Sequence, residues 1–187
     1  MLIDAHQAFA KTSDESACEE LIGRVQQGDQ AAFAQLYAQH NRRVYALCLR
    51  LLADRHYAED VTQEVFVQLW YKISQFKGQS KFTTWLHSVT SNIAISYLRK
   101  HKHWLQKVVS IEKSGMDETS IALCKGLNGL DKLVLRLPER ARLVFVLHAV
   151  EGYRHEEIST MLGMAIGSSK SQYHRARKLL QEWYENE

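Results

Sequence analysis

Apolar residues recur every three or four positions through most of the first hundred residues, with polar residues between them. This spacing is the period of an amphipathic α-helix. It predicts a short helix from Ser16 to Gln27 and a long second helix that begins after Gly28 and Asp29. A third helix is expected between an Asp54 cap and Gln75, and a fourth begins near Phe82 and closes on Arg99, Lys100 and Lys102.

The same periodicity predicts which faces of the helices are buried. In the third helix the expected buried stripe is Ala58, Val61, Val65, Leu69 and Ile73, widened by Phe66 and Trp70. In the fourth helix it is Phe82, Leu86, Val89, Ile93 and Tyr97. Each stripe needs other helices to cover it, so the first hundred residues should form one helical bundle.

The pattern weakens between Trp104 and Gly129, where serine and glycine interrupt short apolar pairs. This segment is interpreted as a linker. A second helical block follows, in which Pro138 is expected at the first position of a helix that Gly152 stops. A short helix from His155 to Leu162, a turn at Gly163, and a last helix from about Gly167 to Tyr184 have the order of a helix-turn-helix unit.

The last predicted helix has two different sides. At about 100° per residue, Ser169, Tyr173, Ala176 and Leu180 fall on one side, and the opposite side is polar and basic. Between Ile166 and Gln181 there are four basic residues and no acidic ones, in a chain whose net charge is only +3. Such a side can neutralise DNA phosphates and reach base edges. The alternative is an ordinary solvated helix face with cations near its C-terminus.

The composition excludes several classes of protein. One proline and nine glycines in 187 residues leave few breaks, which argues against a turn-rich β-sandwich and for an all-α chain. No apolar run approaches the ~20 residues of a membrane span, and the first residues lack the order of a secretion signal, so a cytoplasmic protein is expected. Cys18, Cys48 and Cys124 lack CxxC spacing, and neither a disulfide framework nor a zinc site is expected.

Two long segments carry a family resemblance: YAEDVTQEVFVQLWYKISQFKGQSKFTTWLHSVTSNIAISYLRKHKH in the first block and LPERARLVFVLHAVEGYRHEEISTMLGMAIGSSKSQYHRARKLL in the second. They resemble the two conserved domains of extracytoplasmic-function sigma factors. The resemblance covers about Leu21 to His103 and Leu130 to Leu180. It implies two small helical domains joined by a flexible linker. The expected divisions are a tail (1–15), a first sigma domain (16–103), the linker (104–129) and a second sigma domain (130–187).

The resemblance implies a factor that binds bacterial RNA polymerase core and directs promoter-specific initiation. The first domain would recognise and melt the minus-10 element, for which aromatic and cationic groups suit unstacked bases. The candidate residues there are Phe76, Lys77, Gln79, Ser80, Lys81, Asn92, Arg99 and Lys100. Phe82 and Trp85 are better explained as core residues.

Two further surfaces follow from the resemblance. The exposed side of the third helix would bind the clamp helices of the polymerase largest subunit, unless it is only a solvated acidic face. Its candidate residues are Glu59, Asp60, Gln63, Glu64 and Val67. The last helix would read the minus-35 duplex, with the candidates Ser168, Lys170, Ser171, Gln172, His174, Arg175 and Lys178.

The chain departs from the family pattern at three positions. Ser169 replaces a core valine, and Gln172 stands where a cation is expected. Arg154 stands in place of a Ser or Thr N-cap that would form a capping box with Glu157, a loss worth ~1 kcal/mol. A less rigid second domain or an unusual minus-35 preference is the expected consequence.

Other functions fit the sequence less well. A stand-alone dimeric helix-turn-helix regulator is the alternative, but it leaves the first block without a task. No catalytic constellation occurs at usable spacing, so we expect no enzymatic activity, small-molecule substrate, cofactor or metal. His101 and His103 are about 200° apart on a helix and make a poor ligand pair. The resemblance also implies an anti-sigma partner, often membrane-tethered, that would hold the factor at the inner membrane.

Overall fold

The computed structural model describes residues 17–105, 116 and 129–185. The predicted tail and most of the predicted linker lie outside these residues. Within them the chain is helical and contains no strand. The first block has a helix over residues 17–26, then α2 (Gln30–Leu52), α3 (Arg55–Lys72), a short 3-10 turn η1 (Ile73–Gln75) and α4 (Phe82–Leu105). The second block has α6 (Gly129–Arg136), α7 (Glu139–Phe145), the π-turn η2 (Val146–Val150), α8 (His155–Leu162) and α9 (Ile166–Glu185).

Aspartates begin the two central helices of the first block, as the sequence predicts. Asp29 Oδ1 accepts a hydrogen bond from the Ala32 backbone N–H at 3.0 Å, and Asp54 Oδ1 accepts one from the Tyr57 N–H at 3.0 Å. Between them, Ala53 ends α2 in the left-handed conformation with φ 47°. A single residue therefore separates the end of α2 from the cap of α3, which sets the two helices side by side.

The first block is a bundle in which α2 packs against both α3 and α4. Leu36, Leu47 and Leu51 of α2 have almost no exposed surface, and they meet the α3 stripe from Ala58 to Ile73 that the periodicity predicts. Trp70 lies at the edge of this core, with its ring edge-on to Phe33 at a centroid distance of 5.0 Å. The predicted buried face of the third helix is confirmed.

The predicted buried face of the fourth helix is only partly correct. Phe82 and Leu86 are buried, but the fully buried positions that follow are Thr90, Ser91 and Ala94. The predicted Val89, Ile93 and Tyr97 are half-buried and line a cleft between α3 and α4. The close approach of α4 to the bundle selects small side chains, and the Thr90 hydroxyl is satisfied by the Leu86 carbonyl at 2.8 Å.

The second block packs α9 across α7, with α8 against α9. Leu147, Ile158 and Ala176 are buried at the centre. Gly163, at φ 62°, forms the left-handed turn after α8 that leads into α9. The sequence predicted Pro138 at the first helical position, but in the structure it is the residue before α7. Its carbonyl accepts the first hydrogen bond of that helix, from Arg142 N at 2.9 Å.

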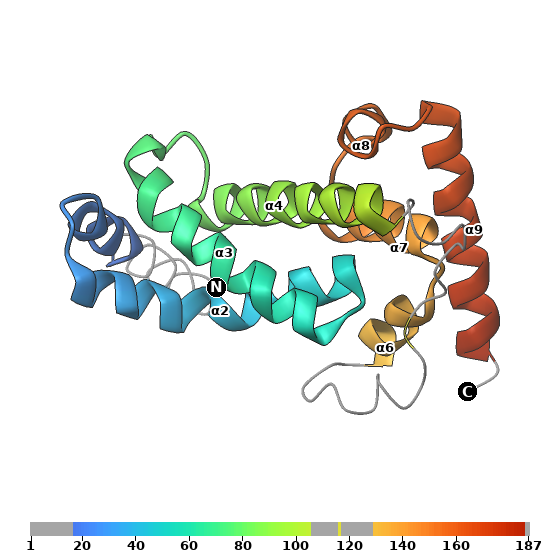
Figure 1. The fold of residues 1–187 in the computed structure, drawn as a ribbon, viewed down its shortest axis with the longest axis horizontal. Coiled ribbons are helices and arrows are strands. Elements are labelled where there is room, and N and C mark those ends of the chain that lie inside the picture. Colours follow the sequence, from blue (N-terminus) through green and yellow to red (C-terminus); the bar gives the residue numbers. More distant parts are fainter. Residues whose placement is uncertain (1–16, 106–115, 117–128, 186–187) are drawn as a thin grey trace, which may run out of the picture.

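The two blocks contact each other through α4 and α2. Figure 1 shows α4 running lengthwise toward α7 and α8, with α9 standing upright at the far end. Arg50 of α2 donates from Nε to Asp131 Oδ1 of α6 at 2.7 Å. His87 Nδ1 of α4 lies 2.9 Å from Glu151 Oε2, whose side chain is 5% exposed. No helix among residues 17–105 and 129–185 is both long and apolar enough to cross a bilayer.

Candidate nucleic-acid interface

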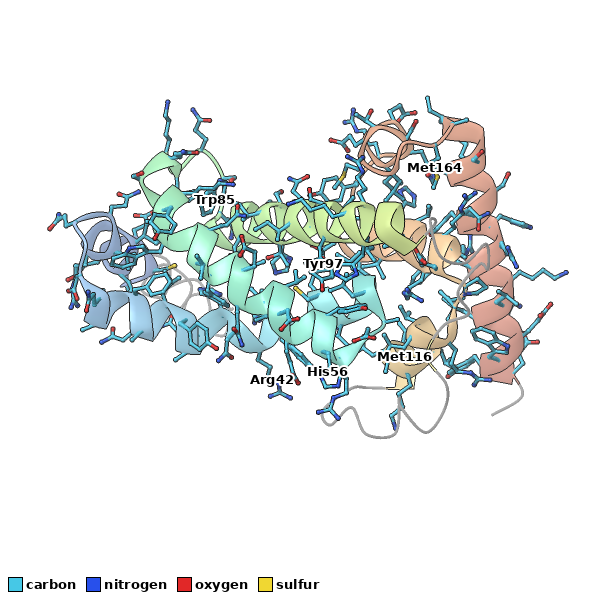
Figure 2. The ribbon with its side chains drawn as sticks, in the orientation of Figure 1. Arg42, His56, Trp85, Tyr97, Met116 and Met164 are labelled. Atoms are coloured by element: carbon cyan, nitrogen blue, oxygen red, sulfur yellow. The ribbon has the colours of Figure 1, made fainter. Side chains whose placement is uncertain are left out.

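The loop between η1 and α4 is built on an aromatic cluster. The rings of Phe76, Phe82 and Trp85 lie 5.4 to 6.0 Å apart. The Gln26 side-chain amide ties the base of the loop down by donating to the carbonyls of Ile73 at 2.9 Å and Phe76 at 3.1 Å. Phe82 is buried, whereas Phe76 and Trp85 are half-buried. Trp85, near the start of α4, is labelled in Figure 2. The cluster is therefore a rigid base for the loop, with two aromatic edges available to solvent.

The tip of this loop is polar and exposed. Lys77, Gln79, Ser80 and Lys81 are all exposed, and Gly78 has φ 69°, a conformation that glycine adopts without strain. Two cations and two hydrogen-bonding side chains are thus held beside aromatic edges. This is the combination that a single-stranded nucleic acid requires, because the cations track phosphates and the rings offer stacking surface.

The α4 candidates occupy two different environments. Asn92 and Lys100 are exposed and line a cleft of about 760 Å³ between α3 and α4. Asp60 and Glu64 of α3 line the same cleft, so acidic and DNA-directed candidates share one groove. Tyr97 forms part of its wall, and burial followed by the nearby Asp60 raises the pKa of the Tyr97 hydroxyl. The sequence assigned Tyr97 to the core, and only its half-buried position reveals this location.

Arg99 does not lie free on the α4 surface. Its guanidinium donates to the backbone carbonyls of Thr160, at 3.2 Å, and Met161, at the C-terminal end of α8. The unpaired carbonyls at the end of a helix carry partial negative charge, which a guanidinium complements. In this arrangement Arg99 joins the two blocks, and its guanidinium is engaged with backbone carbonyls although the residue is exposed.

The exposed side of α3 presents the five predicted residues together. Glu59, Asp60, Gln63, Glu64 and Val67 are all exposed. Val67 is 53% exposed and Tyr71, one turn further, is 74% exposed. Tyr71 was not predicted, although its spacing of four residues from Val67 would have indicated it. A face with carboxylates at one end and bare apolar groups at the other suits a protein partner better than a polyanion.

The outward side of α9 is polar and basic, as predicted. Six of the seven candidates are exposed: Ser168, Lys170, Ser171, His174, Arg175 and Lys178. Lys178 lies 3.8 Å from Glu182, an acidic residue just past the acid-free stretch. Gln172 differs, since it is half-buried and lines a cleft of about 710 Å³ between α9, α7 and the end of α4. Met164, in the turn before α9, borders this cleft (Figure 2).

The structure accounts for two departures from the family pattern. Ser169 is fully buried, and its hydroxyl lies 2.9 Å from His155 Nδ1, so the polar atom has a partner where a valine would only pack. At Arg154, half of a capping box survives, because the Glu157 carboxylate accepts from the Arg154 N–H at 2.7 Å. The expected loss of rigidity at these two positions is therefore smaller than the sequence alone suggests.

No cluster of three or more metal-ligating side chains occurs within the part of the chain that the structure describes. His101 stacks on Tyr97 at a centroid distance of 4.5 Å, which gives it a packing role. The side chain of His103 lies outside the described residues. Burial raises the pKa of the Cys48 thiol to about 12, so this thiol is not a nucleophile at neutral pH.

Comparisons with known proteins match both blocks. The model of Sigma-70 region 2 matches residues 36–103, and that of Sigma-70, region 4 matches residues 127–180. The ECF RNA polymerase sigma factor SigW of Bacillus subtilis is 29% identical over an alignment of 181 residues, which covers 90% of this chain and 97% of the relative. The ECF RNA polymerase sigma-E factor of Escherichia coli K12 is 28% identical over an alignment of 183 residues, which covers 90% of this chain and 94% of that relative.

A solved structure similar to this chain is also a sigma factor. The sigma factor RpoE of Bartonella quintana, crystallised in complex with the anti-sigma factor NepR, is 27% identical with a TM-score of 0.55. The match covers 82% of this chain and 96% of that one. The relatives are sigma factors, a class of initiation factors that is not enzymatic. With both sigma-70 regions present in order, this chain belongs to the extracytoplasmic-function sigma factor family and directs transcription initiation.

Proposed function

We propose that this sigma factor binds RNA polymerase core through the exposed side of α3, defined by Glu59, Asp60, Gln63, Glu64 and Val67. The observation that carries the proposal is that this side of α3, a helix whose opposite side is buried in the bundle, leaves acidic and apolar groups uncovered. The partner is the pair of clamp helices in the polymerase largest subunit. A rigid helix anchored by Val65 and Leu69 presents these groups at little entropic cost.

The promoter is divided between the two domains, residues 16–103 and 130–187. The tip residues Lys77, Gln79, Ser80 and Lys81, with Phe76 beneath them and Asn92 and Lys100 alongside, hold the melted minus-10 strand. The outward side of α9 reads the minus-35 duplex through Ser168, Lys170, Ser171, His174, Arg175 and Lys178. Gln172 contributes only if α9 turns away from the α4 end, because its cleft faces α4 and α7.

Binding of core also releases Arg99. In the free chain its guanidinium occupies carbonyls at the end of α8, and residues 168 and 171 border the same cleft between the blocks. One candidate of each promoter-reading surface, Arg99 and Gln172, is thus held at the contact between the two blocks. The free factor should therefore bind promoter DNA poorly and gain specificity once core separates the two domains.

An anti-sigma protein keeps the factor inactive by preventing it from binding core polymerase. The Bartonella quintana relative was solved with an anti-sigma factor, which supports a partner of this kind here. Such a partner would cover the exposed side of α3 and the basic side of α9 and so compete with core by mass action. A membrane-tethered inhibitor would place this factor at the inner membrane, in a chain otherwise expected to be cytoplasmic.

Reconstitution with bacterial core polymerase tests the function. We expect transcripts that begin at discrete genomic sites only when the factor is added. Asp60→Lys with Glu64→Lys should reduce core affinity by tenfold or more, since it places like charge opposite a basic partner. Glu19→Lys with Glu20→Lys, on the exposed side of the first helix, is the matched control and should retain core binding.

The outcomes of this reconstitution distinguish a sigma factor from a stand-alone dimeric regulator. A stable homodimer that binds a palindromic site without core, and gives no discrete initiation with it, would overturn the sigma-factor mechanism proposed here. That alternative has no observation in its favour. It assigns no task to the exposed side of α3 or to the loop from 76 to 81.

A further inference from the structure

Two histidine rings lie stacked where α8 begins against η2. The ring centroids of His148 and His155 are 4.2 Å apart, with 24° between their planes. His148 Nδ1 lies 2.8 Å from the carbonyl oxygen of Tyr153. Because a carbonyl only accepts, this Nδ1 carries the hydrogen and donates it. The bond fixes the orientation of the His148 ring and the loop that leads into α8.

His155 connects this stack to the recognition helix α9. Its Nδ1 lies 2.9 Å from the Oγ of Ser169, a fully buried residue in the first turn of α9. Tyr173, one turn later, sets its ring edge-on to His148 at a centroid distance of 4.7 Å. The two imidazoles are therefore in contact with the inward side of α9, directly beneath the residues proposed to read the minus-35 duplex.

We propose that His155 is a positioning residue for α9, and that its stack on His148 holds α9 in its DNA-reading orientation only while the His155 ring is neutral. Minus-35 binding should then weaken as the pH falls below neutrality. This inference rests on the proposed function of α9. It adds a pH dependence that arises inside the helix-turn-helix and not at the DNA surface.

The charges around the pair set the direction of the effect. His148 of η2 and Lys170 of α9 face His155 as cations or potential cations, and Glu156 of α8 opposes them. Partial burial, then these two cationic neighbours, lower the pKa of His155 below its ordinary value of 6.5. Arg177, over the Tyr173 ring at 6.0 Å, adds a further positive group on the same helix.

The sign of the pH effect follows from that lowered pKa. A histidine whose pKa is lowered in the folded state makes its full contribution to the stability of that state when the pH is above the pKa of the unfolded chain, near 6.5. The contribution is lost as the pH falls from there through the folded pKa. A protonated His155 can still donate to Ser169, so the interaction that weakens is the stack of the charged His155 ring on His148, beside the Lys170 cation.

The variant His155→Asn isolates this effect. Its side-chain amide occupies the position of Nδ1 and can bond Ser169, but it does not titrate. The experiment measures the affinity of reconstituted holoenzyme for a genomic promoter fragment that it retains, between pH 7.5 and 5.5. We expect the wild-type protein to lose severalfold more affinity than His155→Asn over this range, because only the wild-type side chain becomes charged. His56→Asn, at an exposed position on α3, is the matched control and should follow the wild type.

Imidazole NMR titration of the full-length chain provides the second readout. In His148→Asn one of the neighbours that lower the pKa of His155 is gone, so that pKa should move up toward 6.5. An unchanged His155 titration in that variant, or identical pH profiles for wild type and His155→Asn, would overturn the inference. Loss of the proposed function would look different, because discrete initiation would then be absent at every pH, including 7.5.

Discussion

Asp29 fixes the start of α2 with its carboxylate. The oxygens accept from the Ala32 backbone N–H and from the Arg24 guanidinium, whose Nη2 lies 2.7 Å away. The backbone hydrogen bond first, and the guanidinium second, hold the pKa of this carboxyl below its ordinary value of 3.8. The charged form is therefore favoured by folding.

This lowered pKa predicts an acid sensitivity with a definite sign. A carboxyl whose pKa is lowered by folding makes its full contribution to folding stability when the pH is above its ordinary pKa of 3.8. That contribution is lost as the pH falls through the pKa of the folded state. Asp29→Asn keeps a capping oxygen without the titration. Chemical denaturation between pH 6 and 3 should show a smaller drop in unfolding free energy for the variant. A drop equal to that of the wild type would contradict the assignment.

Residue-scale chemistry in the second domain could not all be foreseen. Arg142 lies in a run of charged residues typical of a surface, yet it is 3% exposed. Its Nη1 donates to the Leu137 carbonyl at 3.0 Å, and burial lowers its pKa to about 10, which leaves it charged at neutral pH. The sequence identified Ser169 as a departure but not its partner, because His155 is fourteen residues away and meets it only through the turn at Gly163.

At the scale of elements, helix positions were predictable because caps and periodicity are local. Asp29, Asp54 and Gly163 mark boundaries through their own hydrogen bonds and φ angles. The rotation of α4 about its own axis was not predictable, since its apolar stripe is wide enough for several rotations to bury apolar residues. Packing chose Thr90 and Ala94 for the interior and left Ile93 and Tyr97 beside α3. The candidate loop residues were predicted as a group, but the pairing of Arg99 with α8 was not.

The two DNA-directed elements should fail in different ways. Lys77→Ala with Lys81→Ala removes cations beside the presumed single strand, and strand opening, measured by permanganate reactivity at the minus-10 element, should fall severalfold. Arg175→Ala should weaken duplex binding and lower the salt slope of affinity by about 0.9. Lys178→Ala should act in the same direction with a smaller effect, because Glu182 already partly neutralises Lys178.

Both assays are needed on both pairs of variants, with holoenzyme at fixed salt. The loop pair should leave gel-shift affinity for closed promoter DNA nearly unchanged. The α9 pair should leave the opening step unchanged once binding is saturated. If all four substitutions reduced binding and opening equally, the division of tasks between the loop and α9 would be wrong.

At the scale of the whole molecule, polar contacts between described residues join the domains, among them Arg50 with Asp131, His87 with Glu151, and Arg99 with the end of α8. Their partners are 81, 64 and 61 residues apart in the chain. No local pattern indicates such pairs, and this explains why the sequence predicted the two domains but not their contact. The arrangement brings the end of α4, an expected minus-10 surface, against the helix-turn-helix.

Weakening these contacts should open the free factor. Arg50→Ala with Glu151→Gln removes one partner from two pairs without altering net charge, and each partly exposed pair contributes about 1 kcal/mol. The open fraction should therefore rise roughly tenfold or more. Small-angle X-ray scattering should give a larger radius of gyration, and the free chain should bind minus-35 duplex more tightly. Arg42→Ala with Glu20→Gln, both at exposed positions, makes the same charge change and should alter neither measurement. An unchanged radius in the first variant would show that apolar packing of α4 on α8 holds the domains together without these pairs.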